Sequence, residues 1–301
     1  MIRYLVASKM PGLSNSLYVA RLRYIQSVHE PLGRRNPDTL VKHFLPLTKR
    51  WRAAWLGREA LSRLRADPFY YYLLARTTYY DQVIRNAVAD DVKRIVNVGC
   101  GTDTRAQRFE ILLSSNKVRV LECDQPEAIR AREQVAKRWR CADRVEYLPI
   151  DLNDGTWPAL RAWLGNGPST RTLVMMEGVS PYVNDSAIRR FLLFLSTTLA
   201  PSSQVAYDFK FRGFRDDFGR DGRTNTPFRQ SPLRDEIESF HEAHGFRLEH
   251  LESSSELTAR LLPSVAKAAL PLFREDGLVQ LRADSGLISG EKSGDGVIGP
   301  P

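Results

Sequence analysis

Cysteine is scarce in this chain, and the spacings of metal or redox cysteine sites are missing. Three cysteines, Cys100, Cys123 and Cys141, occur among 301 residues, and no two of them form a CxxC pair. An odd number of dispersed thiols argues against a disulfide framework and is typical of a reducing compartment. We therefore expect a cytoplasmic protein without a metal site.

Long apolar runs and an export signal are also missing. No run approaches the roughly 18–20 apolar residues that a membrane-spanning helix needs. The N-terminal sequence MIRYLVASKMPGL lacks a convincing hydrophobic segment and a clear small-residue cleavage site. We therefore expect no membrane partner, and we interpret the N-terminus as part of the mature protein.

Positive charge dominates, but it forms no long block. The chain has 44 Lys and Arg residues against 35 Asp and Glu, a net charge of +9. This charge favours an anionic partner, either an acidic small molecule, a nucleic acid or a membrane surface, although arginine-rich surfaces are common without one. Because the basic residues are dispersed, a nucleic acid is not favoured. We expect a small acidic substrate, and the oligomeric state stays open.

The pattern of residue types changes near residue 90. Residues 1–90 are basic, helical in pattern and rich in aromatic residues, and Asp67–Pro68 predicts the start of a helix over 67–88. From residue 94 onward, short β-branched runs alternate with amphipathic stretches, which predicts a doubly wound α/β fold with a mostly parallel sheet. The expected strands are 94–99, 118–124, 145–150, 172–177, 204–210, 247–253 and 277–283. The expected helices between them are 104–115, 126–140, 185–200 and 232–244.

We divide the chain into three parts. Residues 1–90 are expected to form an N-terminal helical cap that covers the substrate, and residues 91–284 the core. Within the core, residues 211–231 are rich in Arg, Gly and Asp and lack periodicity, which predicts a lid insertion after the fifth strand. Residues 285–301 are rich in Gly and Ser without apolar anchors, which predicts a disordered tail.

The stretch RIVNVGCGTDTRAQRF, residues 94–109, joins a strand to a helix through two glycines. Gly99 and Gly101 allow the backbone to approach a ligand closely, and the amides at the helix start favour a carboxylate or another anion. The third glycine of the dinucleotide fingerprint GxGxxG is missing. Asp103 would repel a pyrophosphate; it fits an amine-bearing ligand or caps the next helix.

Three further acids stand at the ends of the next three expected strands. Asp124 in LECDQP is placed to accept both hydroxyls of a ribose, or to cap the following helix. Asp151 in PIDLND could accept an adenine amino group, with the amide of Leu152 donating to a ring nitrogen. Glu177 ends the apolar run before EGVSPYV. Together these positions imply a ligand with a ribose, an adenine, an amine and a carboxylate but no phosphate. S-adenosylmethionine fits this description.

These motifs also resemble the leucine carboxyl methyltransferase family, which are class I S-adenosylmethionine-dependent enzymes. RTTYYDQVI (76–84), NVGCGTDTRAQRF, LECDQP, DLND and EGVSPYV match the family's motifs in register from about residue 76 to residue 210. The resemblance implies a Rossmann-like sheet of about seven strands with N-terminal helices over the site. Residues 1–60 and the expected lid match no branch of the family, so the resemblance does not imply a substrate.

The resemblance also implies a set of cofactor-binding residues. Gly99 would line the methionine part, Asp124 would hold the ribose, and Asp151 with Leu152 would frame the adenine. Glu177 would lie near the methionine part as well. The family pairs an arginine before the sheet with the cofactor's carboxylate, and Arg76 matches it. A further basic residue nearer the N-terminus stays undecided among Arg34, Arg35 and Lys42.

Many bacterial relatives act on small molecules, so we expect a methyl ester to form on a small acidic metabolite. A carboxylate is already ionised and needs no base, and alignment alone supplies up to about 7–11 kcal/mol. The candidates for holding the acceptor are Tyr182, Lys210 and Arg212, with Arg215 as a further one. A hydroxyl acceptor would need a base.

No histidine is obviously placed to be that base. His241 and His244 in HEAH are one residue short of the HExxH zinc spacing, and we expect them on a helix surface. Alternatives are methylation of an RNA base or a protein C-terminal carboxylate, or a non-catalytic S-adenosylmethionine-binding protein. An NAD-dependent reductase is more distant.

Overall fold

The computed structural model describes residues 11–137, 139, 144–165, 170–214, 226–268 and 270–284. Within these residues the strands are β1 (Arg94–Val98), β2 (Arg119–Asp124), β3 (Val145–Pro149), β4 (Thr172–Met176), β5 (Gln204–Phe211), β6 (Arg229–Gln230), β7 (Phe246–Ser253) and β8 (Asp276–Ala283). The helices are α1 (Pro11–His29), α2 (Leu47–Ala54), α3 (Arg58–Arg65), α4 (Pro68–Ala89), α5 (Arg105–Arg108), α6 (Glu110–Ser115), α7 (Pro126–Ala136), α8 (Pro158–Leu164), α9 (Asp185–Thr198), α10 (Arg234–Glu242), α11 (Ser254–Leu261) and α12 (Pro263–Lys267).

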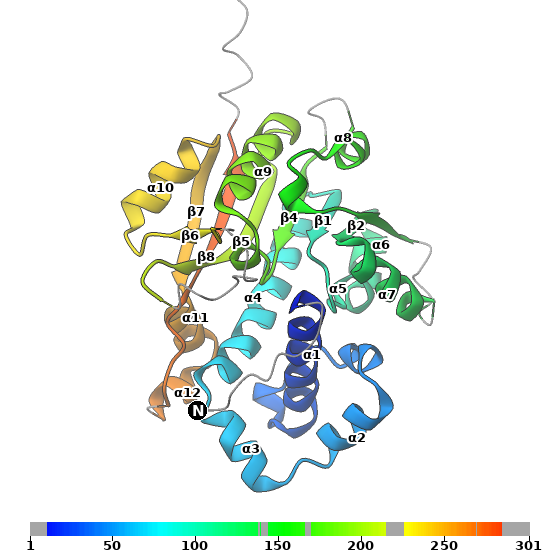
Figure 1. Cartoon of the computed structure of the whole chain (residues 1–301), viewed down its shortest axis with the longest axis vertical. Helices are drawn as coiled ribbons and strands as arrows, with labels where there is room; N and C mark the ends of the chain where they lie inside the picture. The colour runs from blue at the N-terminus through cyan, green and yellow to red at the C-terminus, as the bar shows by residue number, and fades with distance from the viewer. Residues whose placement is uncertain are drawn as a thin grey trace, which may run out of the picture.

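The described strands form one eight-stranded sheet through the middle of the molecule (Figure 1). Its order is β3-β2-β1-β4-β5-β8-β7, and the short β6 pairs with β5. Strands β1 to β6 pair in parallel, whereas β8 runs antiparallel between β5 and β7. This is the mostly parallel, doubly wound α/β fold that the sequence predicts, and all seven expected strands are confirmed.

Helices cover both faces of the sheet, because a parallel sheet must be buried on each side. Alternate residues of a strand therefore enter different apolar clusters: Leu173 and Met175 of β4 join one, Val174 and Met176 the other. The first cluster contains residues of α1, α4 and α11, and the second contains residues of α8, α9 and α10.

The long helix α4 joins the N-terminal segment to the sheet. Asp67 caps it by accepting a hydrogen bond from the Phe69 amide (3.0 Å), and Pro68 occupies its first turn, as the sequence predicts. Its tyrosines 70–72, 79 and 80 are buried in the core that α1 shares with the sheet. The division of the chain at residue 90 into two folding units stays a prediction.

Several boundaries differ from those expected. The helix expected over 104–115 is two short helices, α5 and α6, that meet at Phe109. The helix expected to reach residue 140 ends at Ala136. Helices α8, α11 and α12 were not expected, because each is eight residues or shorter and carries little periodic signal. Of the expected lid, residues 215–225 lie outside the described residues, as does the expected tail 285–301.

Candidate active site

A cavity of about 660 Å³ opens at the carboxyl ends of β1 to β5. In a parallel sheet these ends meet at one edge, so the acids that follow the strands gather there. The cavity is lined by all eight predicted cofactor residues: Arg76, Gly99, Gly101, Asp103, Asp124, Asp151, Leu152 and Glu177. Tyr182 and Lys210 line it too, whereas Arg212 has an exposed side chain outside the lining, and Arg215 lies outside the described residues.

The glycine turn after β1 requires glycine for steric reasons. Gly99 has φ +68°, and a Cβ atom there would lie 2.2 Å from Cγ2 of Val179. The amides of Gly99 and Cys100 both donate to the carbonyl of Cys123, at 2.7 and 3.0 Å, which fixes the turn to β2. The turn therefore has one conformation and leaves no room for a side chain at its tip.

Asp124, at the end of β2, holds the other side of this turn. Its Oδ2 accepts a hydrogen bond from the Gly101 amide at 2.8 Å, and its Oδ1 accepts one from the Gln125 amide at 2.8 Å. Burial raises the pKa of this carboxyl above its usual value. A carboxylate has about four lone-pair positions, so two remain for a ligand in the cavity.

Asp103 is bound by protein groups on both oxygens. Its Oδ1 accepts from the Arg105 amide (2.8 Å), and its Oδ2 accepts from Asn97 (3.0 Å) and from Nη1 of Arg105 (2.7 Å). Burial opposes ionisation, but the guanidiniums of Arg105 and Arg23 together with the hydrogen bond from the Arg105 amide outweigh it and hold the pKa of Asp103 well below its usual range. Of the two roles weighed for this acid, stabilising the start of α5 is present, and an amine-bearing ligand stays a prediction.

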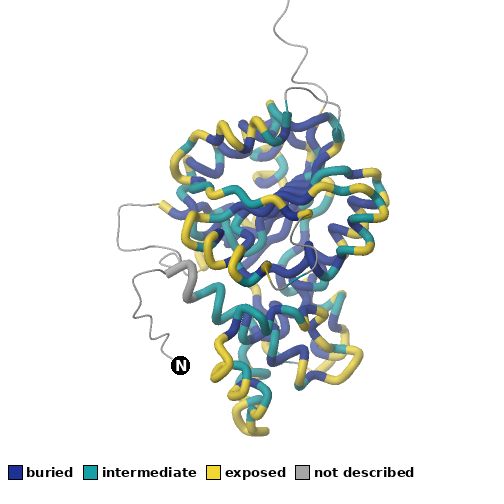
Figure 2. The backbone as a smooth tube through the Cα atoms, turned by 90° about the vertical axis from the view of Figure 1, so that its right-hand side faces the viewer, coloured by how far each residue is buried: buried dark blue, intermediate teal, exposed yellow. Residues whose placement is uncertain are grey.

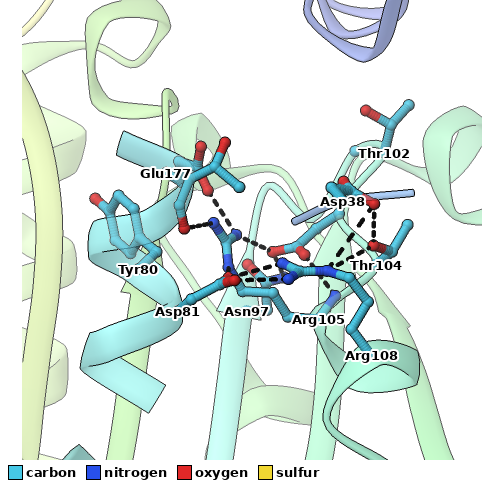
Figure 3. Close-up of polar contacts among 12 residues, drawn as sticks. Asp38, Tyr80, Asp81, Asn97, Thr102, Thr104, Arg105, Arg108 and Glu177 are labelled. Atoms are coloured by element: carbon cyan, nitrogen blue, oxygen red, sulfur yellow. Dashed lines mark hydrogen bonds and ion pairs between the residues drawn. The ribbon is translucent and has the colours of Figure 1, made fainter. Parts of the chain in front are cut away.

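Arg105 connects the glycine turn to the end of β4 (Figure 3). Its Nη1 donates to Glu177 at 2.6 Å and its Nε to Asp81 at 2.8 Å. On the other side of Glu177, Nε of Arg76 donates to Oε1 at 3.1 Å, and Nη1 of Arg76 donates to Asp208 at 3.0 Å. Both guanidiniums are buried, so their positions are fixed before any ligand binds.

Comparison with known proteins agrees with this geometry. Residues 9–196 match the model of the leucine carboxyl methyltransferase family. The chain belongs to this family. A Mycolicibacterium smegmatis relative that carries the provisional name S-adenosyl-L-methionine-dependent methyltransferase is 25% identical over 252 residues, covering 76% of this chain and 78% of the relative. A Frankia alni relative with the same provisional name is 28% identical over 214 residues, covering 67% and 70%.

A solved structure extends the likeness to the whole fold. A protein from Thermobifida fusca, provisionally named a methyltransferase, superposes with a TM-score of 0.55 at 14% identity. The alignment covers 93% of this chain and 100% of that one. The family member described here is thus an S-adenosyl-L-methionine-dependent methyltransferase with a Rossmann-like sheet, as its sequence motifs predict.

The charges of the site fit a cationic cofactor. At and next to the end of the cavity that Glu177 lines, the ion-paired side chains of the described residues include five basic and seven acidic ones. The basic residues are Arg23, Arg76, Arg105, Arg108 and Lys210, and the acidic residues are Asp38, Asp81, Asp103, Glu177, Asp208, Glu275 and Asp276. In their ordinary ionised forms these acids exceed the bases by two. S-adenosyl-L-methionine carries a sulfonium, an ammonium and one carboxylate, so its net positive charge offsets part of that excess.

Helix α1 lies over the glycine turn of the methyltransferase. Ser16 is within hydrogen-bond distance of the Thr102 hydroxyl (3.4 Å), and Nη2 of Arg23 donates to the same oxygen at 2.8 Å. Arg23 also forms a buried ion pair with Asp38 (3.1 Å). The sequence motifs left the N-terminal basic residue undecided among Arg34, Arg35 and Lys42; none of these three lines the cavity, whereas Arg23 does.

At the end of the cavity beyond Glu177, acidic and basic groups alternate. Lys210 lies between Glu275 (3.1 Å) and Asp276 (2.7 Å). Burial raises the pKa of Asp208 to about 6 and outweighs the opposing effect of Arg76. Burial also raises the pKa of Tyr182 to about 12, so its hydroxyl, which accepts a hydrogen bond from Asn15 (3.3 Å), is protonated at neutral pH.

Sequence reasoning missed three residues of this site. Arg105 is the arginine of the GTDTR motif and was available as a signal, but its partners Asp81 and Glu177 come from distant elements. Asp208 lies inside a strand, and Arg23 lies on a helix with no motif. The expectation that His241 and His244 lie on a helix surface is wrong, because both are buried and His241 is bonded to the Tyr207 hydroxyl (2.7 Å).

Proposed function

We propose that this methyltransferase transfers a methyl group to a carboxylate oxygen of a small acidic metabolite. The proposal is supported by Lys210, a buried cation that lines the end of the cavity away from Asp124 and Asp151. Tyr182 lines the cavity too, and its hydroxyl is neutral. Both groups can donate a hydrogen bond to a carboxylate.

The cofactor residues have separate proposed roles. The two remaining lone-pair positions of Asp124 would accept the two ribose hydroxyls, and Asp151 with Leu152 would frame the adenine. Arg76 uses Nε and Nη1 for protein partners, so Nη2 is its donor for the cofactor's carboxylate. Glu177, which is held by Arg76 and Arg105, would place a negative charge beside the methionine part of the cofactor.

When bound, S-adenosyl-L-methionine supplies a methyl group that is already activated by the positive sulfur. A carboxylate oxygen of the acceptor would take this methyl group, with S-adenosylhomocysteine leaving with the electron pair of the broken sulfur–carbon bond. No proton would move, because the acceptor is a carboxylate. The protein therefore contributes alignment and the exclusion of water, for which preformed ion pairs are suited.

The pairing of Lys210 has a consequence for the acceptor's reactivity. Lys210 already contacts the carboxylates of Glu275 and Asp276, so its positive charge is offset. It would therefore position the acceptor by a hydrogen bond without neutralising it. A carboxylate held in this way keeps the electron density that a nucleophile needs.

A hydroxyl acceptor is a second candidate, and one observation favours it. Asp208 is a buried carboxyl that lines the cavity, and burial raises its pKa to about 6. Such a carboxylate is a stronger base than an exposed one, and it could take the proton of a hydroxyl during transfer.

The experiment has two steps. S-adenosyl-L-methionine and S-adenosylhomocysteine are first titrated into the protein by calorimetry, with NADH as control; absence of binding in the presence of candidate acids would overturn the proposal. Radiolabelled methyl transfer is then screened over carboxylic acids and phenols. A labelled product that mild alkali hydrolyses to methanol is an ester and supports the carboxylate; an alkali-stable product whose formation rises with pH through about 6 supports the hydroxyl.

A further inference from the structure

Helix α2 presents its apolar side to solvent. Leu47, Trp51 and Trp55 are spaced at intervals of four residues, so they share one face of the helix and its C-cap. Their exposed fractions are 66%, 65% and 80%. The opposite face carries Ala53, which is fully buried. Helices of globular proteins normally turn the apolar stripe inward, so this exposed stripe requires a partner to explain it.

A further apolar side chain lies on the adjoining segment. Leu32 is 84% exposed and follows α1, whose last residue, His29, bonds to the carbonyl of Ala53 (2.7 Å). Helices α2 and α3 form the end of the molecule opposite α8 (Figure 1), where exposed residues are frequent (Figure 2). We call Leu47, Trp51 and Trp55 the apolar stripe.

The segment that carries the apolar stripe is rich in basic residues. Residues 31–58 contain seven Lys and Arg residues and one acid, Asp38, which is buried and paired with Arg23. This segment alone therefore supplies six of the nine net positive charges of the chain. On α2 itself Lys49 and Arg52 are exposed. The nearest exposed acid along the chain, Glu59, is paired with Arg63.

We propose that the apolar stripe and the basic residues of its segment dock the protein on an anionic lipid surface. Tryptophans favour the headgroup level of a bilayer, leucines the acyl boundary below it, and Lys and Arg the anionic headgroups. A single-stranded nucleic acid would also meet the cations and stack on the tryptophans. It would leave Leu47 in water, so the composition of the stripe favours lipid.

This proposal departs from the expectation of no membrane partner. That expectation rested on the lack of a spanning segment, and no helix among the described residues is long and apolar enough to cross a bilayer. Docking on a surface needs only one face of a helix and its flanking charges. The proposal is independent of which acceptor the cavity takes.

The test is co-sedimentation of the full-length protein with vesicles of phosphatidylcholine alone, or of phosphatidylcholine and phosphatidylserine in equal parts. We expect binding to the second kind only. Trp51→Ser with Trp55→Ser should weaken it at least about tenfold. Arg52→Gln should weaken it roughly fivefold, because Arg52 is exposed and follows Trp51 directly on α2. Ile111→Ser, at an 82% exposed site on α6, is the matched control and should bind as the wild type does.

Three results would overturn the proposal. The first is absence of wild-type binding to the phosphatidylserine vesicles, and the second is equal binding by the tryptophan variant. The third is a wild type that self-associates and binds no vesicles, with the Trp51→Ser, Trp55→Ser variant monomeric. That result would show that the stripe binds a second copy of this chain. Far-UV circular dichroism spectra and urea midpoints like those of the wild type would show that each variant is folded, so that a loss of binding reflects the changed surface.

Discussion

Asp124 offers a test that separates the structural and the binding role of one carboxylate. In the structure it accepts two backbone hydrogen bonds, from Gly101 and Gln125. Its two remaining lone-pair positions equal the number of ribose hydroxyls in the proposed cofactor site. Each role can be assigned a free energy.

Asp124→Ala removes both roles. The Gly101 amide loses its acceptor, which costs about 1–3 kcal/mol of the free energy of unfolding. Two hydrogen bonds to a charged acceptor, at about 1.5–3 kcal/mol each, are lost from cofactor binding. We therefore expect the Kd for S-adenosyl-L-methionine to rise by at least about 150-fold, which corresponds to about 3 kcal/mol.

Asp124→Asn separates the two effects. The amide oxygen still accepts from Gly101, and the exposed Gln125 amide is free to bond with water, so the unfolding free energy should stay within about 1 kcal/mol of the wild type. The NH2 group accepts no hydrogen bond. We expect the Kd to rise roughly 10- to 100-fold from the loss of charge and of one acceptor.

The assays are calorimetric titration of S-adenosyl-L-methionine and urea unfolding of both variants. Glu146→Gln, on the exposed pair with Arg119, is the control and should match the wild type in both. A wild-type Kd in either Asp124 variant would refute the reasoning, because a ribose held elsewhere would not respond to this carboxylate.

Three further predictions concern the stability of the site. Gly99→Ala should lose at least about 2 kcal/mol of unfolding free energy, because the backbone φ is +68° and the new Cβ would lie 2.2 Å from Val179. Gly57→Ala, whose Cβ meets no atom within 4 Å, is the control and should lose little. Equal losses in the two variants would contradict the proposed strain at Gly99. Lys210→Met removes the cation beside the buried Asp276 and the half-buried Glu275 and should cost about 3–5 kcal/mol in urea unfolding. A cost below about 1 kcal/mol would show that the pairing adds nothing. Because the native pKa of Asp208, about 6, exceeds its unfolded value of 3.8, the native state binds more protons between these values. The stability that Asp208 contributes is therefore full below pH 3.8 and is lost as the pH rises through 6, by at most about 3 kcal/mol. Asp208→Asn should remove this pH dependence from unfolding curves measured between these values. An unchanged pH dependence in the variant would assign it to another group.

The strands and the cavity acids were predictable because local patterns specify both. Short β-branched runs mark β1 and β2, and a parallel sheet carries the residue after each strand to the same edge. Asp124, Asp151 and Glu177 therefore lie at one cavity although they are far apart in sequence.

The partners of the buried arginines could not be predicted in this way. Arg105 meets Asp81 and Glu177 only after α4, α5 and β4 have packed, and no spacing along the chain encodes that meeting. Arg212 illustrates the converse: it follows Lys210 by two residues, but its side chain is exposed outside the cavity, where β5 has ended.

The position of β8 in the sheet affects how the chain is made. This strand is the last described element, yet it lies between β5 and β7 and contributes Asp276 to the cavity. Until the ribosome has released residues 276–283, β5 has an open edge whose Tyr207 and Phe209 have no partner strand on that side. A nascent chain therefore exposes an aromatic edge until β8 has emerged, and such edges are sites of aggregation. This part of the sheet can close only after β8 is made, so a product truncated before residue 276 would neither close its sheet nor complete its cavity.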